Sequence, residues 1–161
     1  MAKELKFIAI IPARYASTRF PGKPLAKLGG KPVIQRVYER VTSVISNAVV
    51  ATDDERIYAA VESFGGKVVM TSENHKSGTD RCWEAYQKQG EEYDVVINVQ
   101  GDEPFIAESQ LRSIMACFED EATDIAIEGD WSAAAMLLVA GAIAGEVTLT
   151  NVSMLSNQAD V

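Results

Sequence analysis

Positive charges gather on residues 14–24, an irregular stretch that we call the cationic loop. Arg14, Arg19 and Lys23 lie within ten residues of one another, in a chain whose formal net charge is −8. Three prolines lie in or beside the stretch. Because each proline lacks a backbone donor, we expect neither a strand ladder nor a regular helix there. Two guanidinium forks and a lysine point charge suit a polyanion such as a triphosphate, and the alternative is a surface loop whose charges are solvated.

A carboxylate follows a second apolar run of the sequence. Residues 94–99, DVVINV, are apolar on both faces and therefore typical of a central strand, and Asp102 comes shortly after them. An aspartate at that position is well placed to bind Mg²⁺, a hard cation that one or two carboxylates usually hold together with substrate phosphates. The alternative is an ordinary Gly-Asp turn at the end of a strand.

A third polar segment precedes a predicted helix. Ser77 and Thr79 flank a glycine, and their simplest interpretation is a helix N-cap with a turn. Arg81 would lie in the first helical turn, where a cation opposes the helix dipole, so contact with an anion or an acidic residue would account for it. His75 is a possible general base, and the alternative is a solvated loop histidine.

These groups together suit the transfer of a nucleotidyl group. In such a reaction a hydroxyl attacks the α-phosphorus of a nucleoside triphosphate and pyrophosphate leaves, so the protein mainly positions the reactants and neutralises charge. Arg14, Arg19 and Lys23 would stabilise the charge on the leaving pyrophosphate, and Asp102 would hold the metal. No side chain needs to act as a nucleophile.

Short apolar strands that alternate with amphipathic helices must position these side chains. The pattern predicts an α/β fold with a mostly parallel sheet, helices on both faces and right-handed crossovers. The three polar segments would then share the edge of the sheet where ligands bind. The absence of a Gly-x-Gly-x-x-Gly or Walker motif disfavours a dinucleotide-binding domain or a P-loop enzyme. The expected strands are residues 7–11, 48–51, 67–70, 94–99 and 123–127, and the expected helices are 31–46, 52–64, 79–89 and 109–118.

Composition sets further limits on the function. The chain has 161 residues, of which 47% are hydrophobic and 24% charged, as expected for one globular domain. Its acidic balance argues against a nucleic-acid or membrane partner. The N-terminus lacks the apolar core of a signal peptide, and Cys82 and Cys117 lack a metal-binding spacing, so we expect a cytoplasmic protein with buried, reduced thiols. A single histidine is too few for a histidine-based metal site.

The cationic loop carries a family resemblance. Pro-Ala-Arg-x-x-Ser-Thr-Arg-x-Pro-x-Lys closely resembles the signature loop of the sugar nucleotidylyltransferases, and within them that of the CMP-KDO synthetases, the 3-deoxy-manno-octulosonate cytidylyltransferases. The stretches ATDDERI, GGKVVMTSENHKSGTDR and VVINVQGDEP resemble the same family, so the resemblance covers roughly residues 5 to 125.

The resemblance implies a reaction and a set of roles. CTP and KDO would give CMP-KDO and pyrophosphate, with Mg²⁺ as cofactor, in a cytoplasmic step of lipopolysaccharide synthesis. Arg14, Lys23 and Asp102 are then the expected catalytic residues, with Asp102 as the magnesium ligand. The residues expected to bind the nucleotide are Arg14, Arg19, Lys23, Ser77, Thr79, Arg81 and Gln100.

From about Ile127 the sequence no longer resembles that family. Residues 127–161 are instead similar to a piece of 5-enolpyruvylshikimate-3-phosphate synthase, from which we carry over no role. We therefore expect a chimera: residues 1–126 form the nucleotide-binding half of a cytidylyltransferase-like domain, and residues 127–161 pack onto it. The resemblance implies a three-layer, Rossmann-like nucleotidyltransferase sheet, here truncated and closed by a C-terminal βαβ unit.

Residues 132–144 are apolar nearly all round and too short to span a bilayer as a helix. Such a helix needs cover, so we expect a homo-oligomer. Three functions stay open: a cytidylyltransferase impaired by the absence of its acceptor-binding half, a catalytically inactive engineered or recombinant α/β chimera, and a general nucleotide-binding module.

Overall fold

The computed structural model describes residues 4–16 and 20–119. The chain divides into two units between Glu108 and Ser109, and each unit is considered by itself. The first unit holds the sheet. The described part of the second unit, residues 109–119, holds all of helix α4 (Glu108–Cys117) except its first residue.

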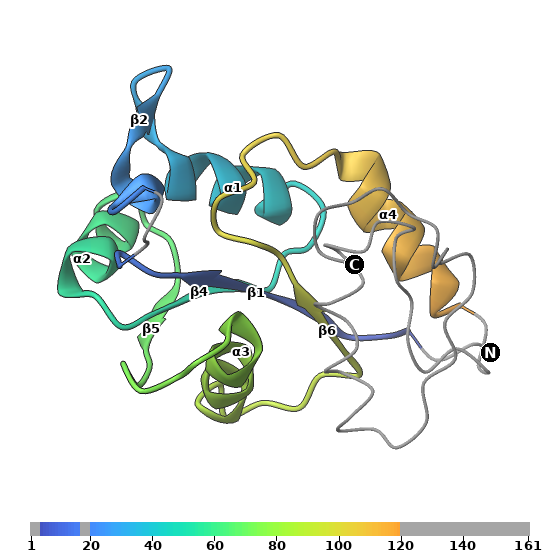
Figure 1. The fold of residues 1–161 in the computed structure, drawn as a ribbon. Helices are drawn as coiled ribbons and strands as arrows, with labels where there is room; N and C mark the ends of the chain where they lie inside the picture. The colour runs from blue at the N-terminus through green and yellow to red at the C-terminus, as the bar shows by residue number, and fades with distance from the viewer. Residues whose placement is uncertain (1–3, 17–19, 120–161) are drawn as a thin grey trace, which may run out of the picture. The chain divides into compact units, whose positions relative to one another are not determined.

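A parallel sheet forms the core of the first unit (Figure 1). Strand β1 (Phe7–Ala13) pairs with β4 (Ala48–Thr52) on one side and with β6 (Val95–Asn98) on the other, and β5 (Val68–Met70) pairs with β4. The strand order is β5-β4-β1-β6, and every pair is parallel. The predicted parallel α/β sheet is therefore confirmed.

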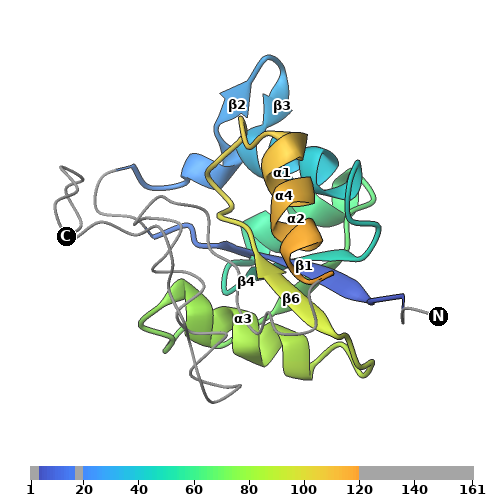
Figure 2. The ribbon, with the colours of Figure 1, turned by 90° about the vertical axis from the view of Figure 1, so that its right-hand side faces the viewer.

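Helices cover both faces of this sheet. Helices α1 (Val33–Thr42) and α2 (Glu55–Ser63) lie on one face, and α3 (Gly78–Gln87) lies on the other, as both views show (Figures 1 and 2). Because α3 carries the chain from β5 to the far side of β1, the strand order reverses between β1 and β6. Open α/β sheets bind ligands at such a reversal, beyond the carboxyl ends of the strands.

The small elements after β1 were not predicted. A 3-10 helix, η1 (Lys23–Leu25), is followed by a hairpin of β2 (Lys27–Leu28) and β3 (Lys31–Pro32). The helix expected over residues 31–46 begins only at Val33, because the two residues before it belong to the hairpin. Strands of two residues are too short to show a periodicity.

Strand β1 also runs past the residue where it was expected to end. It continues through Pro12, which lies opposite Ala51 of β4. The Pro12 carbonyl accepts a hydrogen bond from Gly101 N, at 3.2 Å. The backbone groups of Pro12 therefore face the side of the sheet on which β6 lies, at a level past Asn98, where β6 has already ended. Proline is tolerated there because the ladder requires no donor from it.

Gly101 allows the turn after β6 to lie directly against β1. A Cβ atom at this position would be 2.6 Å from Pro12 O and 3.2 Å from Ala13 Cβ. Only a residue without a side chain can come this close, so Gly101 determines where the next residue, Asp102, lies.

Several predictions concern residues outside the described ranges. They are the strand over 123–127, the apolar helix over 132–144 with the self-association inferred from it, and the packing of residues 127–161. In residues 4–16 and 20–119, no helix has the length and apolarity needed to cross a membrane.

We predict that Gly101→Ala destabilises the protein by about 1–3 kcal/mol, because the added methyl group must push apart two backbone segments. The free energy of unfolding in urea measures this. Gly78→Ala is the matched control, since its Cβ would meet only Pro12 side-chain atoms at 3.6 and 3.8 Å, an ordinary contact. An equal loss in both variants would contradict the argument.

Candidate functional site

Lys23 and Asp102 meet at the carboxyl edge of the sheet. Lys23 Nζ lies 2.7 Å from Asp102 Oδ2, and the two side chains are 42% and 47% exposed. An exposed ion pair of this kind contributes at most about 1 kcal/mol. The pair is therefore accessible, and a ligand could replace either partner at little cost.

Arg14 links the cationic loop to the segment after β5. Its guanidinium donates to the Lys76 carbonyl at 3.3 Å. Together with the Lys23–Asp102 pair, this contact connects the three segments that the sequence predicted to share one edge of the sheet. Arg19 lies outside the described residues.

The three polar candidates Ser77, Thr79 and Gln100 lie on the same edge. Ser77 is the N-cap of α3: its hydroxyl accepts from Asp80 N at 3.1 Å and donates to the Asp80 carboxylate at 2.8 Å. Thr79 is the second residue of that helix, and Gln100 follows β6. The capping interpretation of Ser77 is confirmed, and contact of the three residues with a nucleotide stays a prediction.

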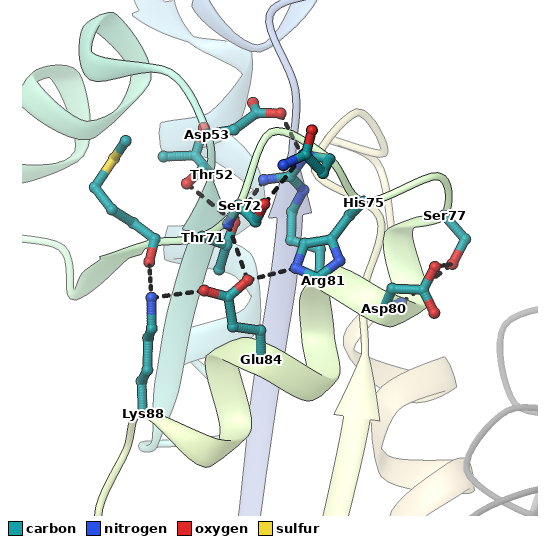
Figure 3. A network of polar contacts seen from close by, with 12 residues as sticks. Thr52, Asp53, Thr71, Ser72, His75, Ser77, Asp80, Arg81, Glu84 and Lys88 are labelled. Atoms are coloured by element: carbon teal, nitrogen blue, oxygen red, sulfur yellow. Dashed lines mark hydrogen bonds and ion pairs between the residues drawn. The ribbon is translucent and has the colours of Figure 1, made fainter.

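The position of Arg81 differs from what was expected, because its side chain was expected to line the nucleotide pocket. Its side chain is fully buried, and its guanidinium donates to Thr71 Oγ1 and to Asp53 Oδ2, both at 2.5 Å (Figure 3). Asp53 is thus the acidic contact that accounts for a cation in the first turn of a helix. With no exposed surface, Arg81 has a structural role beneath the edge.

Thr71 connects this buried pair to the sheet. Its backbone N–H and its hydroxyl both donate to the Thr52 carbonyl, at 2.8 and 3.1 Å. Arg81 then joins the same hydroxyl to α3. These bonds fix the point at which the chain leaves β5, and therefore the start of segment 71–77, which we call the β5–α3 loop.

Glu84 holds the next part of the β5–α3 loop. Its carboxylate accepts from Lys88 Nζ at 2.6 Å and from Ser72 N at 2.9 Å, and it binds Nε2 of His75 (Figure 3). The hydrogen bonds from Lys88, Ser72 and His75 lower the Glu84 pKa to about 2. Because Glu84 engages the His75 ring, the alternative of a merely solvated loop histidine is wrong, and action of His75 as a general base stays a prediction.

Sequence reasoning missed Asp53 as a functional support. Residues 52–55 were interpreted as a capping box, but the cap of α2 is Asp54, which accepts from the backbone N–H groups of Arg56 and Ile57. The signal for Asp53 was present in its partner, since Arg81 needed an anion. Nothing in the sequence showed which acidic residue would supply it.

Cysteine chemistry is not supported at this edge. Burial raises the pKa of the Cys82 thiol to about 12, so it stays protonated. Cys117 is exposed, which corrects the expectation that both thiols are buried. In the described part of the chain no three His, Cys, Asp or Glu side chains gather as a metal site.

The fold and this edge define a class of protein: an α/β nucleotidyltransferase-like protein, with its candidate site where the strand order reverses. The cytidylyltransferase family model matches residues 8–151, so the chain belongs to the cytidylyltransferase family.

Relatives give the same assignment over a shorter range. The chain is 73% identical over 122 residues to the 3-deoxy-manno-octulosonate cytidylyltransferase of Phocaeicola vulgatus, which covers 76% of this chain and 48% of the relative. It is 55% identical over 118 residues to the 8-amino-3,8-dideoxy-manno-octulosonate cytidylyltransferase of Shewanella putrefaciens, covering 71% of this chain and 48% of the relative.

A solved structure is similar too. The CMP:2-keto-3-deoxy-manno-octonic acid synthetase complexed with CTP matches with a TM-score of 0.72 and 46% identity, over 76% of this chain and 51% of that chain. The chain spans about half the length of the curated relatives it matches. The family match continues to residue 151, past Ile127 where the resemblance was expected to stop, and the foreign origin of residues 127–161 stays a prediction.

We predict that Arg81→Met destabilises the protein by about 3 kcal/mol or more, because it leaves the Asp53 carboxylate, which is only 18% exposed, without its partner. The double variant Arg81→Met/Asp53→Asn should recover part of the loss. The control is Arg40→Met, which removes an exposed 3.4 Å pair with Glu108 and should cost less than about 1 kcal/mol. Equal losses for Arg40 and Arg81 in urea unfolding would refute the buried pair.

We predict a pH-dependent role for Glu84. Because its pKa is lowered from 4.5 to about 2 in the folded protein, the carboxylate stabilises the fold above about pH 4.5, and this stabilisation disappears as the pH falls towards 2. Unfolding of Glu84→Gln and of the parent between pH 2.5 and 7 should show a difference that shrinks on acidification. Exposed Glu62 provides the control, Glu62→Gln, and a difference for Glu84 that stays constant with pH would be evidence against the assignment.

Proposed function

We propose that this chain binds CTP with Mg²⁺ at the edge formed by the cationic loop, the β5–α3 loop and the turn after β6, and transfers CMP to KDO. The observation that carries the proposal is the exposed pair of Lys23 and Asp102 at 2.7 Å, which puts a cation and a carboxylate side by side at the switch point of the sheet. The relatives named for this reaction support it.

The chemistry follows from the charges at this edge. The acceptor hydroxyl oxygen forms a bond to the α-phosphorus, the bond from the α-phosphorus to the bridging oxygen breaks, and pyrophosphate leaves with the electron pair. The hydroxyl proton passes to solvent. Arg14, Arg19 and Lys23 would bind the phosphates and stabilise the charge that grows on the leaving group. Ser77, Thr79 and Gln100 would contact the nucleoside.

The residues present fit a magnesium ion that the protein holds through a single carboxylate. Asp102 offers one exposed carboxylate, and in the described part of the chain no cluster of three ligating side chains accompanies it. Mg²⁺ commonly takes one or two carboxylates and completes its shell with phosphate oxygens and water. Asp102 would hold the ion, which when bound would add positive charge at the phosphate oxygens.

The acceptor has two candidates among the relatives. The 73% identity to a 3-deoxy-manno-octulosonate enzyme exceeds the 55% identity to an 8-amino-3,8-dideoxy-manno-octulosonate enzyme, and therefore favours KDO. The two sugars differ by an amine in place of a hydroxyl. Comparing pyrophosphate release with each sugar discriminates between them. Lipopolysaccharide precursor synthesis in the cytoplasm is the setting that the KDO reaction implies.

Measurements of nucleotide binding and of pyrophosphate release distinguish two alternatives from the proposed function. An inactive α/β chimera would bind no CTP. A general nucleotide-binding module would bind CTP, UTP and ATP alike. Nucleotide binding without pyrophosphate release would instead indicate that the acceptor-binding function is impaired.

We predict that Lys23→Ala weakens CTP·Mg²⁺ binding at least tenfold in calorimetry. Loss of a charge-assisted hydrogen bond costs about 1.5–3 kcal/mol, and 1.4 kcal/mol corresponds to a factor of ten. Asp102→Asn should make the remaining CTP affinity independent of Mg²⁺. Lys27→Ala, an exposed lysine in the nearby hairpin, is the control and should bind as the parent does. Absence of CTP binding in the parent protein would overturn the proposed function.

A further inference from the structure

We propose that Arg56, held by Asp54, positions the cationic loop by stacking on the ring of Tyr15. The contact joins α2 to a loop residue that carries no charge and that the proposed reaction does not use. The proposal rests on the proposed function, because the loop it orders is the expected phosphate-binding element. It makes Tyr15 and Arg56 positioning residues, which act through the loop and not on the ligand.

The guanidinium lies directly on the aromatic ring. Arg56 Cζ is 3.3 Å from the centroid of the Tyr15 ring. An arginine plane over a tyrosine face is attracted by the negative charge of the ring face and by dispersion. The stack needs the guanidinium to keep one orientation, and the residues around Arg56 provide that constraint.

Asp54 fixes the guanidinium by two parallel hydrogen bonds. Arg56 Nε donates to Asp54 Oδ1 at 3.0 Å, and one terminal nitrogen of Arg56 donates to Oδ2 at 2.6 Å. These bonds, together with backbone N–H donors, lower the Asp54 pKa. Asp54 is also the N-cap of α2, a helix that buries Ile57 and Val61. The Arg56 guanidinium is therefore anchored to helix α2 through Asp54, although the Arg56 side chain is 59% exposed.

Tyr15 passes this constraint directly to Gly22, the residue before Lys23. Its carbonyl accepts from Gly22 N at 2.8 Å, which closes the loop, and its ring lies so near Gly22 that a Cβ there would be 2.9 Å from the ring edge. Gly22 has a φ of 72°, a conformation that disfavours other residues. Tyr15 thus holds Gly22 by both its backbone and its ring.

The residue after Gly22 is Lys23. The Gly22 carbonyl accepts from Leu25 N at 2.9 Å. The position of Gly22 therefore also determines the position of η1, the short helix from which Lys23 reaches Asp102. A loop that holds Lys23 in place before the ligand arrives loses less conformational freedom on binding. The chain of contacts therefore runs from Asp54 through Arg56, Tyr15 and Gly22 to the site.

The test measures the loop and the ligand separately. Hydrogen exchange of the Gly22 amide reports closure of the loop without any nucleotide, and calorimetry reports CTP·Mg²⁺ affinity. Tyr15→Leu and Arg56→Ala should each accelerate Gly22 exchange and weaken CTP binding, both by about two- to fivefold, the range expected for an exposed cation–π contact. The double variant should be no worse than either single variant, because both remove one interaction.

Conservative variants and a control arginine distinguish positioning from general destabilisation. Tyr15→Phe keeps the ring face and should restore both exchange and affinity to parent values. Arg40→Ala, which removes an exposed arginine of α1, should change neither.

Three results would overturn the proposal. The first is an unchanged rate of Gly22 exchange in Tyr15→Leu and Arg56→Ala, and the second is a loss of CTP affinity in Tyr15→Phe equal to that in Tyr15→Leu. The third is weaker CTP binding in Arg56→Ala with unchanged binding in Tyr15→Leu, which would make Arg56 a direct ligand contact. If the parent binds no CTP while Gly22 exchange responds as expected, the proposed function fails and the loop contact stands.

Discussion

The backbone hydrogen bond from Gly101 to Pro12 determines where the carboxylate of this edge lies. It forms one residue before Asp102, and it draws the turn after β6 onto the end of β1. The cationic loop leaves the same end of β1, so Lys23 and Asp102 are brought together from positions 79 residues apart. The contact depends on two residues. Pro12 lacks a backbone N–H, but the ladder requires no donor at its position, and Gly101 has no Cβ to hold the two segments apart. Both choices of residue serve the approach of two strands at the switch point.

The junction between β4 and α2 supports the edge in two different ways. Asp53 binds the fully buried Arg81, beneath the β5–α3 loop, and Asp54 binds the exposed Arg56, beside the cationic loop. A buried arginine must keep its partner, since an unpaired charge in the interior is costly. An exposed arginine makes a weak and adjustable contact. One part of the edge is therefore supported by a buried ion pair, and the other by an exposed contact between Arg56 and Tyr15.

Much of the fold was predictable because it depends on local patterns. The apolar run over residues 48–51 became β4, and the polar Ser77 before a periodic segment became an N-cap. The meeting of Lys23 with Asp102 followed from topology, since the carboxyl ends of parallel strands share an edge. The pairing of Arg81 with Asp53 did not follow, because it joins residues 28 apart on opposite sides of the β5 connection. The stack of Tyr15 on Arg56 was equally hidden, since each residue alone is an ordinary surface side chain.

The exposed Lys23–Asp102 pair has a consequence for how charge is balanced if the proposed function holds. Each member of the pair is the natural partner of one half of a magnesium nucleotide: the ammonium group suits the phosphates, and the carboxylate suits the metal. A phosphate that takes Lys23 leaves Asp102 with a negative charge unpaired, and this favours the metal; a metal that takes Asp102 leaves Lys23 free for the phosphate. Because the pair is weak in water, exchanging it for the two new contacts costs little. In a chain of net charge −8, this coupling would let the proposed anionic ligand and its cation bind together without leaving an uncompensated charge at the edge.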